Sequence, residues 1–519
     1  MTLSQTLIAV LSLSTLTLVG CQNGDGGMPE NNDAHEARKT DATPKPLYAL
    51  AWSSMQTSSD NTDDKTSEKA QQPAWIVPFF WLRNDATPEQ AKAFLDQQPA
   101  GARCMIWVWD GIGGDPMQNK ADLLDTPDGA RVRGLWMDHG IQQTSQAMRD
   151  FFRRFKAIGG QVDYLVMDHE YGFTRWHPDM TEQAFKAIEN DPRFQSEGWP
   201  EKLGFSDLPK ELVQTPYPTE NQVRWNLLMR SHTATILNQS IYEPVREFFP
   251  DIKVSNYGNA YSVGIPDCNG HIHQITETPW RLHVGSDQSA ETYGRIKPGL
   301  QKKKFDGQRP FGASPFKSFL LGVNSARAMA SHDSVSFMPW IAFLAFDREG
   351  CFYGQTDYYQ ELVLHVAMAN PDVLLYWNPR PWKPEHDPST LTTNAQDELV
   401  SRLLTQFNTQ AGYADRKPLS IELVDWYASY VLSGMTVNHQ TLWRFTPELN
   451  LEAGEQADST IVSRKPLVFR IKGITVKFPH GSLLDTGGED APLGFWIIAP
   501  ASERPVIELA PAGDSVAAH

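Results

Sequence analysis

The sequence has few cysteines and no surplus of basic residues. Its 519 residues include four cysteines, 46 lysines and arginines, and 62 aspartates and glutamates, giving a formal net charge of −16 at pH 7. An acidic surface repels phosphate backbones and anionic lipid, so nucleic acid is excluded as a partner. Cys104, Cys268 and Cys351 form no CxxC pair and indicate neither a zinc site nor a disulfide framework. We expect Cys104, in an apolar strand pattern, to be a free buried thiol.

Long hydrophobic runs, internal repeats and nucleotide-binding glycine motifs are also missing. No GxGxxG turn follows the first expected strand, which disfavours dinucleotide binding, and no cofactor is expected. Hydrophobic residues nevertheless make up 40% of the chain, enough for a sizeable core, and 16 residues are tryptophan. Indole rings are flat and apolar, and sugar-binding clefts use such faces to stack on the C–H groups of pyranose rings.

The N-terminal apolar run, residues 6–19, is too short to span a bilayer and is typical of a signal peptide. It ends in LVGC at 18–21, which resembles the bacterial lipobox, although no Lys or Arg precedes the run. The resemblance implies a signal peptide over 1–21, lipidation of Cys21 and a location in the cell envelope, with the lipid anchor as the only membrane contact. A plain signal peptide with a coincidental cysteine is the alternative.

Composition divides the rest of the chain into three parts. Residues 22–73 are polar and poor in large apolar side chains, which predicts a disordered linker with a short ordered stretch at 47–55. Residues 74–412 alternate short apolar strands with helical patterns, which predicts an α/β fold, a (β/α)8 TIM-type barrel, with an open doubly wound sheet as the alternative. Residues 413–519 carry short β-like segments and predict a C-terminal β-sandwich domain. The eight barrel strands are expected at 75–82, 104–109, 132–137, 162–167, 252–256, 272–276, 335–343 and 373–376.

Two carboxylates follow the fourth expected strand, in the run VDYLVMDHEYG over 162–172. Side chains alternate along a strand, so Asp168 and Glu170 are expected on one side at its carboxyl end, where barrel active sites are built. Two carboxylates this close push their pKa values apart, and one can stay protonated near neutral pH. Glycoside hydrolysis needs this pair, an acid for the leaving oxygen and an anion beside the oxocarbenium-like transition state. A hydrogen-bonded rim aspartate is the structural alternative.

The same run resembles two groups of glycoside hydrolases. It is similar to the fourth-strand D-x-E of the hyaluronidase and chitinase-like hydrolases, which implies that Glu170 is the acid/base and that Asp168 orients the substrate's acetamido group. It also resembles the D-Y-L-x-x-D strand of α-galactosidase-like barrels, which implies that Asp168 is the nucleophile. Val166 stands where the fuller chitinase signature has another acidic residue. Each resemblance covers about ten residues and supports a retaining glycosidase-type barrel.

Other strand ends supply further candidates. Glu277 follows the sixth expected strand and is the catalytic partner carboxylate if Asp168 is the nucleophile. Tryptophans at strand ends can form the floor of a sugar subsite, and a tyrosine hydroxyl can bind a sugar, although the same side chains can simply close a barrel. The expected substrate-binding residues are Trp109, Asp138, Tyr257, Trp340, Trp377 and Asn378.

One histidine pair, His271 and His273, has the spacing of two metal ligands on a strand. The pair lies near the sixth strand, whereas metal-dependent barrel hydrolases place it on the first, so no metal is expected. The sequence therefore favours a glycoside hydrolase that acts on a poly- or oligosaccharide by a retaining acid/base mechanism. The alternatives are a non-catalytic surface glycan-binding lipoprotein and a metal-dependent hydrolase.

Overall fold

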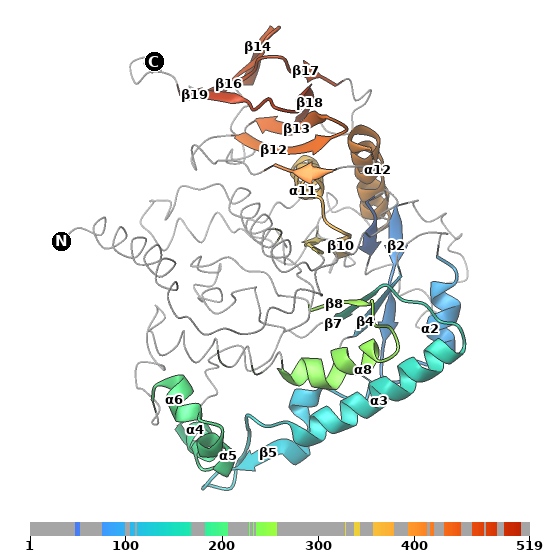
Figure 1. Ribbon diagram of the computed structural model, residues 1–519, viewed down its shortest axis with the longest axis vertical. Helices are drawn as coiled ribbons and strands as arrows, with labels where there is room; N and C mark the ends of the chain where they lie inside the picture. Colours follow the sequence, from blue (N-terminus) through green and yellow to red (C-terminus); the bar gives the residue numbers. More distant parts are fainter. Residues whose placement is uncertain are drawn as a thin grey trace, which may run out of the picture. The chain divides into compact units, whose positions relative to one another are not determined.

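We analysed a computed structural model of the chain (Figure 1). It describes residues 47–51, 75–98, 104–108, 112–167, 182–205, 235–256, 337–342, 356–377, 393–412, 416–419, 430–447, 459–471, 474–484 and 493–509, together with residues 228, 232 and 327. The expected signal peptide and the sixth expected strand lie outside these residues. Within the described ranges, no helix combines the length and the apolar character needed to cross a bilayer.

Parallel strands form the first part of the fold. One sheet has the order β2 (Ile76–Pro78), β1 (Ala49–Ala51), β10 (Leu374–Trp377) and β9 (Trp340–Ala342), and all its neighbours are parallel. A second parallel sheet has the order β3 (Phe80–Leu82), β4 (Met105–Val108), β7 (Tyr164–Met167) and β8 (Lys253–Asn256). Only Phe79 separates β2 from β3, so one stretch of chain belongs to both sheets. The earliest described strand, β1, pairs with the last parallel one, β10.

Strand β1 lies inside the range 22–73, which the composition assigned to a linker. It is held on both sides, since Ala49 pairs with Ile76 of β2 and with Leu374 of β10. The preceding Leu47 is buried, and its backbone N–H donates to the side chain of Asn408 at 2.9 Å. The parallel part of the fold therefore begins earlier in the chain than its expected start at residue 74.

The strand expected at 132–137 does not belong to the described parallel sheets. Instead, β6 (Arg131–Arg133) pairs antiparallel with β5 (Leu123–Asp125) in a small hairpin. The connecting sequence Thr-Pro-Asp-Gly at 126–129 is a strong turn signal, and Gly129 takes the positive φ of +83° that such a turn requires. When β2 and β3 are counted as one stretch of chain, β7 is the fourth of the described parallel strands, after β1, β2–β3 and β4.

One face of both parallel sheets shares a single apolar cluster, which we call the inner cluster. Its members are Val77, Phe79, Met105, Trp107, Tyr164, Val166, Met338, Val373 and Leu375. The rings of Phe79 and Trp107 stack within it, 5.2 Å apart. Residues at the intervening positions, such as Ile106 and Leu165, pack in a separate cluster with helices. The two sheets therefore bury one face against each other's side chains and the opposite face under helices, as parallel sheets require.

The helices that cover the second sheet start and end as their sequences predict. Helix α2 (Pro88–Leu95) has a capping box in which Thr87 and Gln90 each accept from the other's backbone N–H, with Pro88 in the first turn. Helix α3 (Asp138–Ala157) buries its apolar stripe and is followed by Gly159 at φ +82°, a C-terminal signal. Figure 1 shows α3 and α8 (Glu243–Arg246) along β4, β7 and β8.

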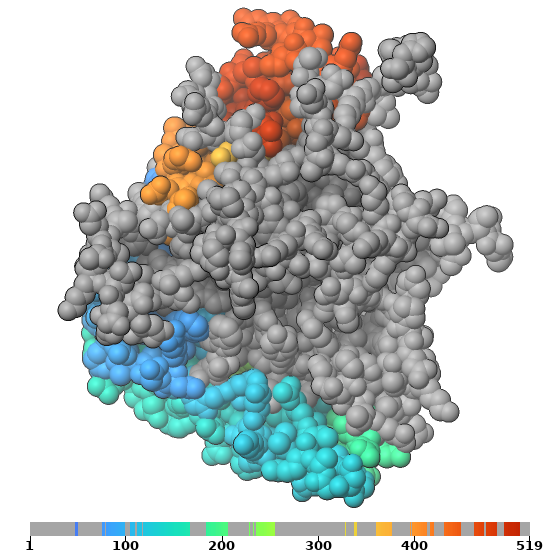
Figure 2. All heavy atoms as spheres, turned by 180° about the vertical axis from the view of Figure 1, so that it is seen from behind, coloured from blue at the N-terminus to red at the C-terminus, as the bar shows by residue number. Residues whose placement is uncertain are grey.

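The remaining helical segments complete this part of the fold. They are the 3-10 turns η2 (Pro116–Gln118) and η3 (Lys120–Asp122), the helices α4 (Glu182–Glu189), α5 (Pro192–Ser196) and α6 (Trp199–Leu203), the π-helical turn η5 (Asn238–Tyr242), and the helices α11 (Thr356–Ala367) and α12 (Thr393–Ala411). Helices α11 and α12 pack on the first parallel sheet. On the face seen in Figure 2, the blue atoms of the segment 75–98 adjoin the cyan atoms of the segment 112–160.

Two antiparallel sheets follow. The first has the order β11 (Lys417–Pro418), β12 (Tyr430–Val437), β13 (Gln440–Pro447), β18 (Phe495–Pro500) and β17 (Ser482–Leu483), and the second has β14 (Ser459–Arg464), β15 (Leu467–Ile471), β16 (Ile474–Phe478) and β19 (Val506–Leu509). Their facing side chains share one aromatic core, where the rings of Phe445 and Phe469 lie 4.5 Å apart. The opposite face of the first sheet, with Leu442 and Trp496, packs in the cluster of α11 and α12. This arrangement is the one expected of a C-terminal sandwich.

A buried polar network links α11 to β13. Glu361 of α11 accepts from Arg444 through both of its carboxylate oxygens, with the Nε bond at 2.9 Å, and from Thr446 at 2.5 Å. His365, one turn further along α11, bonds to Ser433 at 2.8 Å and to Thr446 at 2.9 Å. Glu361, His365 and Arg444 are almost fully buried. Each charged group therefore depends on the others for its hydrogen bonds.

We expect this network to make the stability of the protein fall below neutral pH. Burial, and then the charge of Arg444, lower the pKa of His365 well below its ordinary 6.5. The unfolded chain therefore binds a proton that the folded chain does not, so the free energy of unfolding falls as pH falls through about 6.5. Urea denaturation between pH 8 and 5 measures this slope, which H365N should reduce. The control H439N changes a histidine in an exposed turn, and a slope equally reduced in H439N would contradict the assignment.

Candidate functional site

The carboxyl ends of four neighbouring strands lie in one row. The register pairs Leu82 with Val108, Val108 with Met167, and Met167 with Asn256. Adjacent strands are about 4.8 Å apart, so the residues that follow these four start from one edge of the sheet. By sequence, the residues that follow directly are Arg83, Trp109, Asp168 and Tyr257.

The structure describes three of the residues expected in the site. Trp340 is the first residue of β9, and Trp377, the last residue of β10, pairs with Ala342. Asp138 is the first residue of helix α3. The other expected residues, and the histidine pair, lie outside the described residues: Cys21, Trp109, Asp168, Glu170, Tyr257, His271, His273, Glu277 and Asn378.

Asp138 belongs to a charged cluster between α3 and α5. Its carboxylate accepts from Arg193 Nη1 at 2.6 Å, and the same guanidinium binds Asp191 at 2.9 Å. The guanidinium also lies 4.5 Å from the ring centroid of Trp136. The hydrogen bonds that Arg193 donates to Asp191 first, and then to Asp138, raise the pKa of its guanidinium. Because Asp138 is 71% exposed and does not follow a parallel strand, the described geometry gives it an ion-pair role at the surface.

Asp122 organises the start of α3. This buried carboxylate accepts from the backbone N–H of His139 at 3.1 Å and of Gly140 at 2.8 Å, and it contacts His139 Nδ1 at 2.8 Å. A carboxylate at the N-terminus of a helix satisfies otherwise unpaired N–H groups and favours the helix dipole. The helix start is therefore fixed from a residue 16 positions earlier in the chain, which the sequence analysis did not identify.

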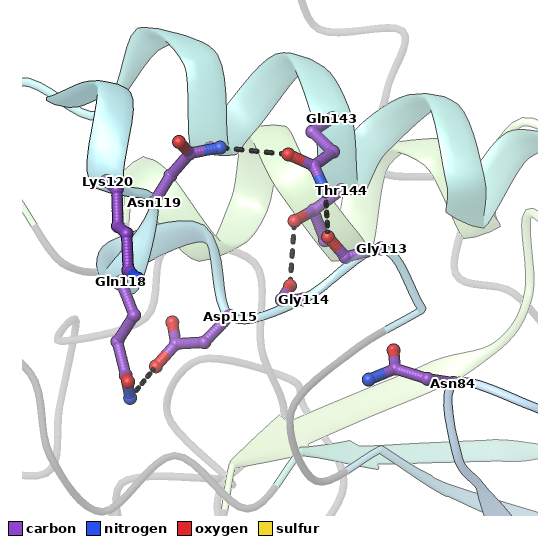
Figure 3. A pocket seen from close by; sticks show the side chains of 10 residues that line it. Asn84, Gly113, Gly114, Asp115, Gln118, Asn119, Lys120, Gln143 and Thr144 are labelled. Carbon is purple, nitrogen blue, oxygen red and sulfur yellow. Dashed lines mark hydrogen bonds between the residues drawn. The ribbon is translucent and has the colours of Figure 1, made fainter.

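A polar pocket of about 410 Å³ opens beside the carboxyl ends of β3 and β4 (Figure 3). Asn84 comes two residues after β3, and the other lining residues come from the loop after β4, from η2 and η3, and from the first turns of α3. We call it the amide pocket, and its lining residues are Asn84, Gly113, Gly114, Asp115, Gln118, Asn119, Lys120, Gly140, Gln143 and Thr144. Figure 3 shows the amide of Asn84 pointing from the end of β3 toward the loop that carries Gly114.

Hydrogen bonds hold the wall of the amide pocket in place. Gln143 and Thr144 of α3 donate to the carbonyls of Gly113 and Gly114, at 2.6 and 2.9 Å. The two glycines have φ values of +90° and +99°, a conformation that side chains disfavour. Asn119 donates to Gln143 at 2.9 Å, so the turn before α3 is tied to the same helix. Sequence reasoning missed this pocket. The signal that could have indicated it is the run DGIGGDPMQNK at 110–120, which supplies Gly113, Gly114 and several of its polar side chains.

Cys104 lies at the opposite, amino end of β4. Burial, and then the charge of Asp163, raise the pKa of its thiol to about 11. Its backbone N–H donates to the Asp163 carboxylate at 2.8 Å. The thiol is free, as the sequence predicted, but it is half-buried where full burial was expected, and it is held in its unreactive protonated form. Among the residues that the structure describes, no group of three or more His, Cys, Asp or Glu side chains could hold a metal ion.

Comparisons give no family for the chain. No family model and no curated protein matches the sequence. Among solved structures, it is similar to a GH30 endoxylanase from Clostridium papyrosolvens C71, with 11% identity over 82% of this chain and 90% of the other, and a TM-score of 0.32.

Two further similar structures have the same low scores. The catalytic domain of a beta-amylase from Paenibacillus polymyxa has 11% identity, covers 64% of this chain and 90% of that one, and has a TM-score of 0.35. An alpha-galactosidase from Lactobacillus brevis has 11% identity, 81% and 47% coverage, and a TM-score of 0.35. These neighbours are glycoside hydrolases by name. At TM-scores this low, the likeness decides neither the fold nor the activity.

Proposed function

We propose that the chain is a glycoside hydrolase that acts on a poly- or oligosaccharide with retention of configuration. Glu170 is the general acid/base, and Asp168 supplies the anion beside the reacting carbon. The observation that carries the proposal is the register of the described strands. It aligns the ends of β3, β4, β7 and β8 in one row, and Asp168 is the first residue after β7.

The alternation of side chains supports the same site. Tyr164 and Val166 of β7 belong to the inner cluster, whereas Leu165 packs under helices, so continued alternation predicts the inner side for residues 168 and 170. The alternation within each described strand predicts the inner side for the aromatic and acidic candidates Trp109, Asp168, Glu170, Tyr257, Trp340 and Trp377. Asn378 falls on the opposite parity, and Glu277 and Asp138 follow no described parallel strand. Two acids and several aromatic rings on one enclosed side are the residue types that a glycosidase needs.

The chemistry then runs in two steps. Glu170 donates its proton to the glycosidic oxygen, and the bond from that oxygen to the anomeric carbon breaks. The anomeric carbon bonds either to an Asp168 oxygen or to an acetamido oxygen of the substrate that Asp168 orients. Glu170, now ionised, takes a proton from water, whose oxygen attacks the anomeric carbon from the face that the leaving group vacated. The bond from that carbon to the Asp168 oxygen, or to the acetamido oxygen, breaks as the bond to water forms, which returns the carboxylate or the acetamido group. Two displacements retain the configuration of the anomeric carbon. If Asp168 is the nucleophile and Glu277 is its partner carboxylate, Glu277 is the acid in place of Glu170.

We further propose that the parallel strands close into a (β/α)8 barrel within residues 74–412, extended at its start by β1, with residues 413–519 as the accessory sandwich. The pairing of β1 with β10 and the inner cluster shared by both sheets support closure. The remaining partners of β8 and β9 would come from residues between 257 and 336. A closed ring places all carboxyl ends around one mouth, which is where barrel enzymes carry their active sites.

The proposed location is the cell envelope, where cleavage before Cys21 leaves this cysteine as the lipidated N-terminus. The proposed tether runs from residue 22 to the start of the fold at Leu47 and β1. Support comes from the apolar run and the LVGC sequence. Labelled palmitate fed to expressing bacteria should enter the wild-type chain and not C21S. Incorporation that persists in C21S would contradict lipidation at this residue.

The function is tested on the purified wild-type chain with polysaccharides and hexasaccharides derived from xylan, cellulose, starch and agarose, and with an alginate hexasaccharide. We expect new reducing ends from at least one neutral substrate, and proton NMR should show that the first product has the anomeric configuration of the substrate. Inverted products would contradict the retaining mechanism. Saturable binding without reducing ends after long incubation would favour a glycan-binding protein, and activity lost only with a chelator would favour a metal-dependent hydrolase.

A further inference from the structure

We propose that the amide pocket binds an uncharged sugar unit of a glycan chain, next to the proposed reaction centre. The inference rests on the proposed function and names the substrate class of that site. The polar side chains of the pocket include four primary amides, one carboxylate and one ammonium group. The amides belong to Asn84, Gln118, Asn119 and Gln143, the carboxylate to Asp115 and the ammonium group to Lys120.

Amide side chains match the hydrogen-bonding character of sugars. Each sugar hydroxyl both donates and accepts, and each primary amide offers two N–H donors and a carbonyl acceptor. Among the described residues, none forms a hydrogen bond with the Asn84 amide or with the Lys120 ammonium group. The side-chain N–H of Gln118 donates to the Asp115 carboxylate at 2.7 Å, so the side-chain carbonyl of Gln118 points away from Asp115. The pocket therefore keeps both donors and acceptors that its own residues do not occupy.

The pocket is also preorganised. Gln143 and Thr144 fix the loop at Gly113 and Gly114, and Asn119 is held to the same helix. Gly140 lies so close to Pro116 that a Cβ there would meet the Pro116 carbonyl oxygen at 1.9 Å, so the helix and the turn cannot separate without loss of this packing. Side chains that are already fixed before binding lose less conformational entropy when the ligand binds. Its volume of about 410 Å³ lies in the usual range for small-ligand sites, about 300–1,000 Å³.

The charges of the site favour a neutral glycan. Asp115 and Lys120 carry opposite charges, so the lining has no net charge. The chain as a whole carries −16, which repels polyuronates and sulfated glycans. A sugar whose only polar groups are hydroxyls carries no charge, so the acidic protein does not repel it.

The position of the pocket relates it to the proposed acids. Asn84 and the loop at Gly113 follow β3 and β4, and Asp168 follows β7, the neighbour of β4. Neighbouring parallel strands lie about 4.8 Å apart. A glycan chain that places its scissile bond beside Asp168 can therefore extend along the edge into the amide pocket. The pocket would hold a sugar unit that does not itself react.

The test measures binding and hydrolysis separately. Isothermal titration calorimetry is run on the wild type, on N84A/Q118A and on the control Q97A, which changes an exposed amide beyond α2, with the neutral hexasaccharides and the alginate hexasaccharide. We expect N84A/Q118A to weaken binding of the preferred neutral hexasaccharide about tenfold, and Q97A to bind as the wild type does. Hydrolysis is measured separately, as the release of reducing ends from the same hexasaccharides by the wild type and by Q97A, which should have the same rates.

The outcomes separate this inference from the proposed function. Unchanged hexasaccharide binding in N84A/Q118A, or tighter wild-type binding of the alginate hexasaccharide than of every neutral one, would overturn the inference while hydrolysis stands. Weaker binding in N84A/Q118A without hydrolysis by the wild type would support the pocket and refute the enzyme. Absence of wild-type binding to all neutral hexasaccharides would overturn the inference too.

Discussion

Replacement of Glu170 by glutamine is expected to lower kcat/KM on the natural glycan by about a hundred- to ten-thousandfold, because an amide cannot donate a proton to the leaving oxygen. The change keeps the size and polarity of the side chain, so the thermal midpoint should stay at the wild-type value. The loss should shrink on an aryl glycoside with a dinitrophenol leaving group, because this group departs without protonation. The measurement compares kcat/KM on both substrates.

The matched control is E201Q, which makes the same chemical change at an exposed residue of α6. We expect wild-type rates on both substrates from this variant. Full activity of E170Q on the natural glycan would show that Glu170 is not the acid. An equal loss on both substrates would mean that the residue acts in another step, and E277Q would then be the next variant.

Replacement of Glu361 by alanine is expected to lower the free energy of unfolding by about 3–5 kcal/mol. The substitution leaves the Arg444 guanidinium buried without its carboxylate partner, and Thr446 loses an acceptor. A positive charge in this setting has no access to water, and its desolvation is no longer compensated. Urea denaturation of the full chain, followed by tryptophan fluorescence, measures the loss.

Two further variants test the cause. E247A removes the partner of Arg149 in an ion pair that is partly exposed, and its cost should be at most about 1 kcal/mol. E361L/R444M replaces both buried charges by apolar side chains and should recover most of the stability lost in E361A. If the double variant is less stable than E361A, packing volume and not charge burial explains the effect.

The sequence predicted most of the elements whose pattern is local. The parallel strands at 105–108, 164–167 and 374–377 are short apolar runs, and the N-terminus of α2 follows from the order Thr87, Pro88 and Gln90. A short ordered stretch was expected at 47–55, but not as a strand of the parallel fold, because its residues follow a long polar segment. Only its pairing with β2 and β10 makes Ala49–Ala51 a strand. The hairpin of β5 and β6 was misjudged because the apolar residues after it suggested a buried strand, while the Pro-Asp-Gly turn was overlooked.

The candidate site likewise has one part that a local sequence pattern reveals and one part that it does not. Asp168 and Glu170 stand out in the sequence because two acids at the end of an apolar strand have a recognisable spacing. The amide pocket does not stand out, because asparagine and glutamine are common in loops and are not reactive. Its shape depends on contacts such as that of Thr144 with Gly114, 30 residues apart, which no local pattern encodes. Asp138 looked like a strand-end acid only as long as the hairpin before it was taken for a barrel strand.

The sheet formed by β12, β13 and β18 is covered on both faces, by the second antiparallel sheet on one and by α11 and α12 on the other. If the chain ended after α12, the apolar side chains of α11 and α12 that pack on this sheet would be exposed to water. Glu361 and His365 would also lose their hydrogen-bond partners on β12 and β13. Engineering of this protein must therefore keep its last hundred residues attached, and fusion partners belong elsewhere than at a cut near residue 412.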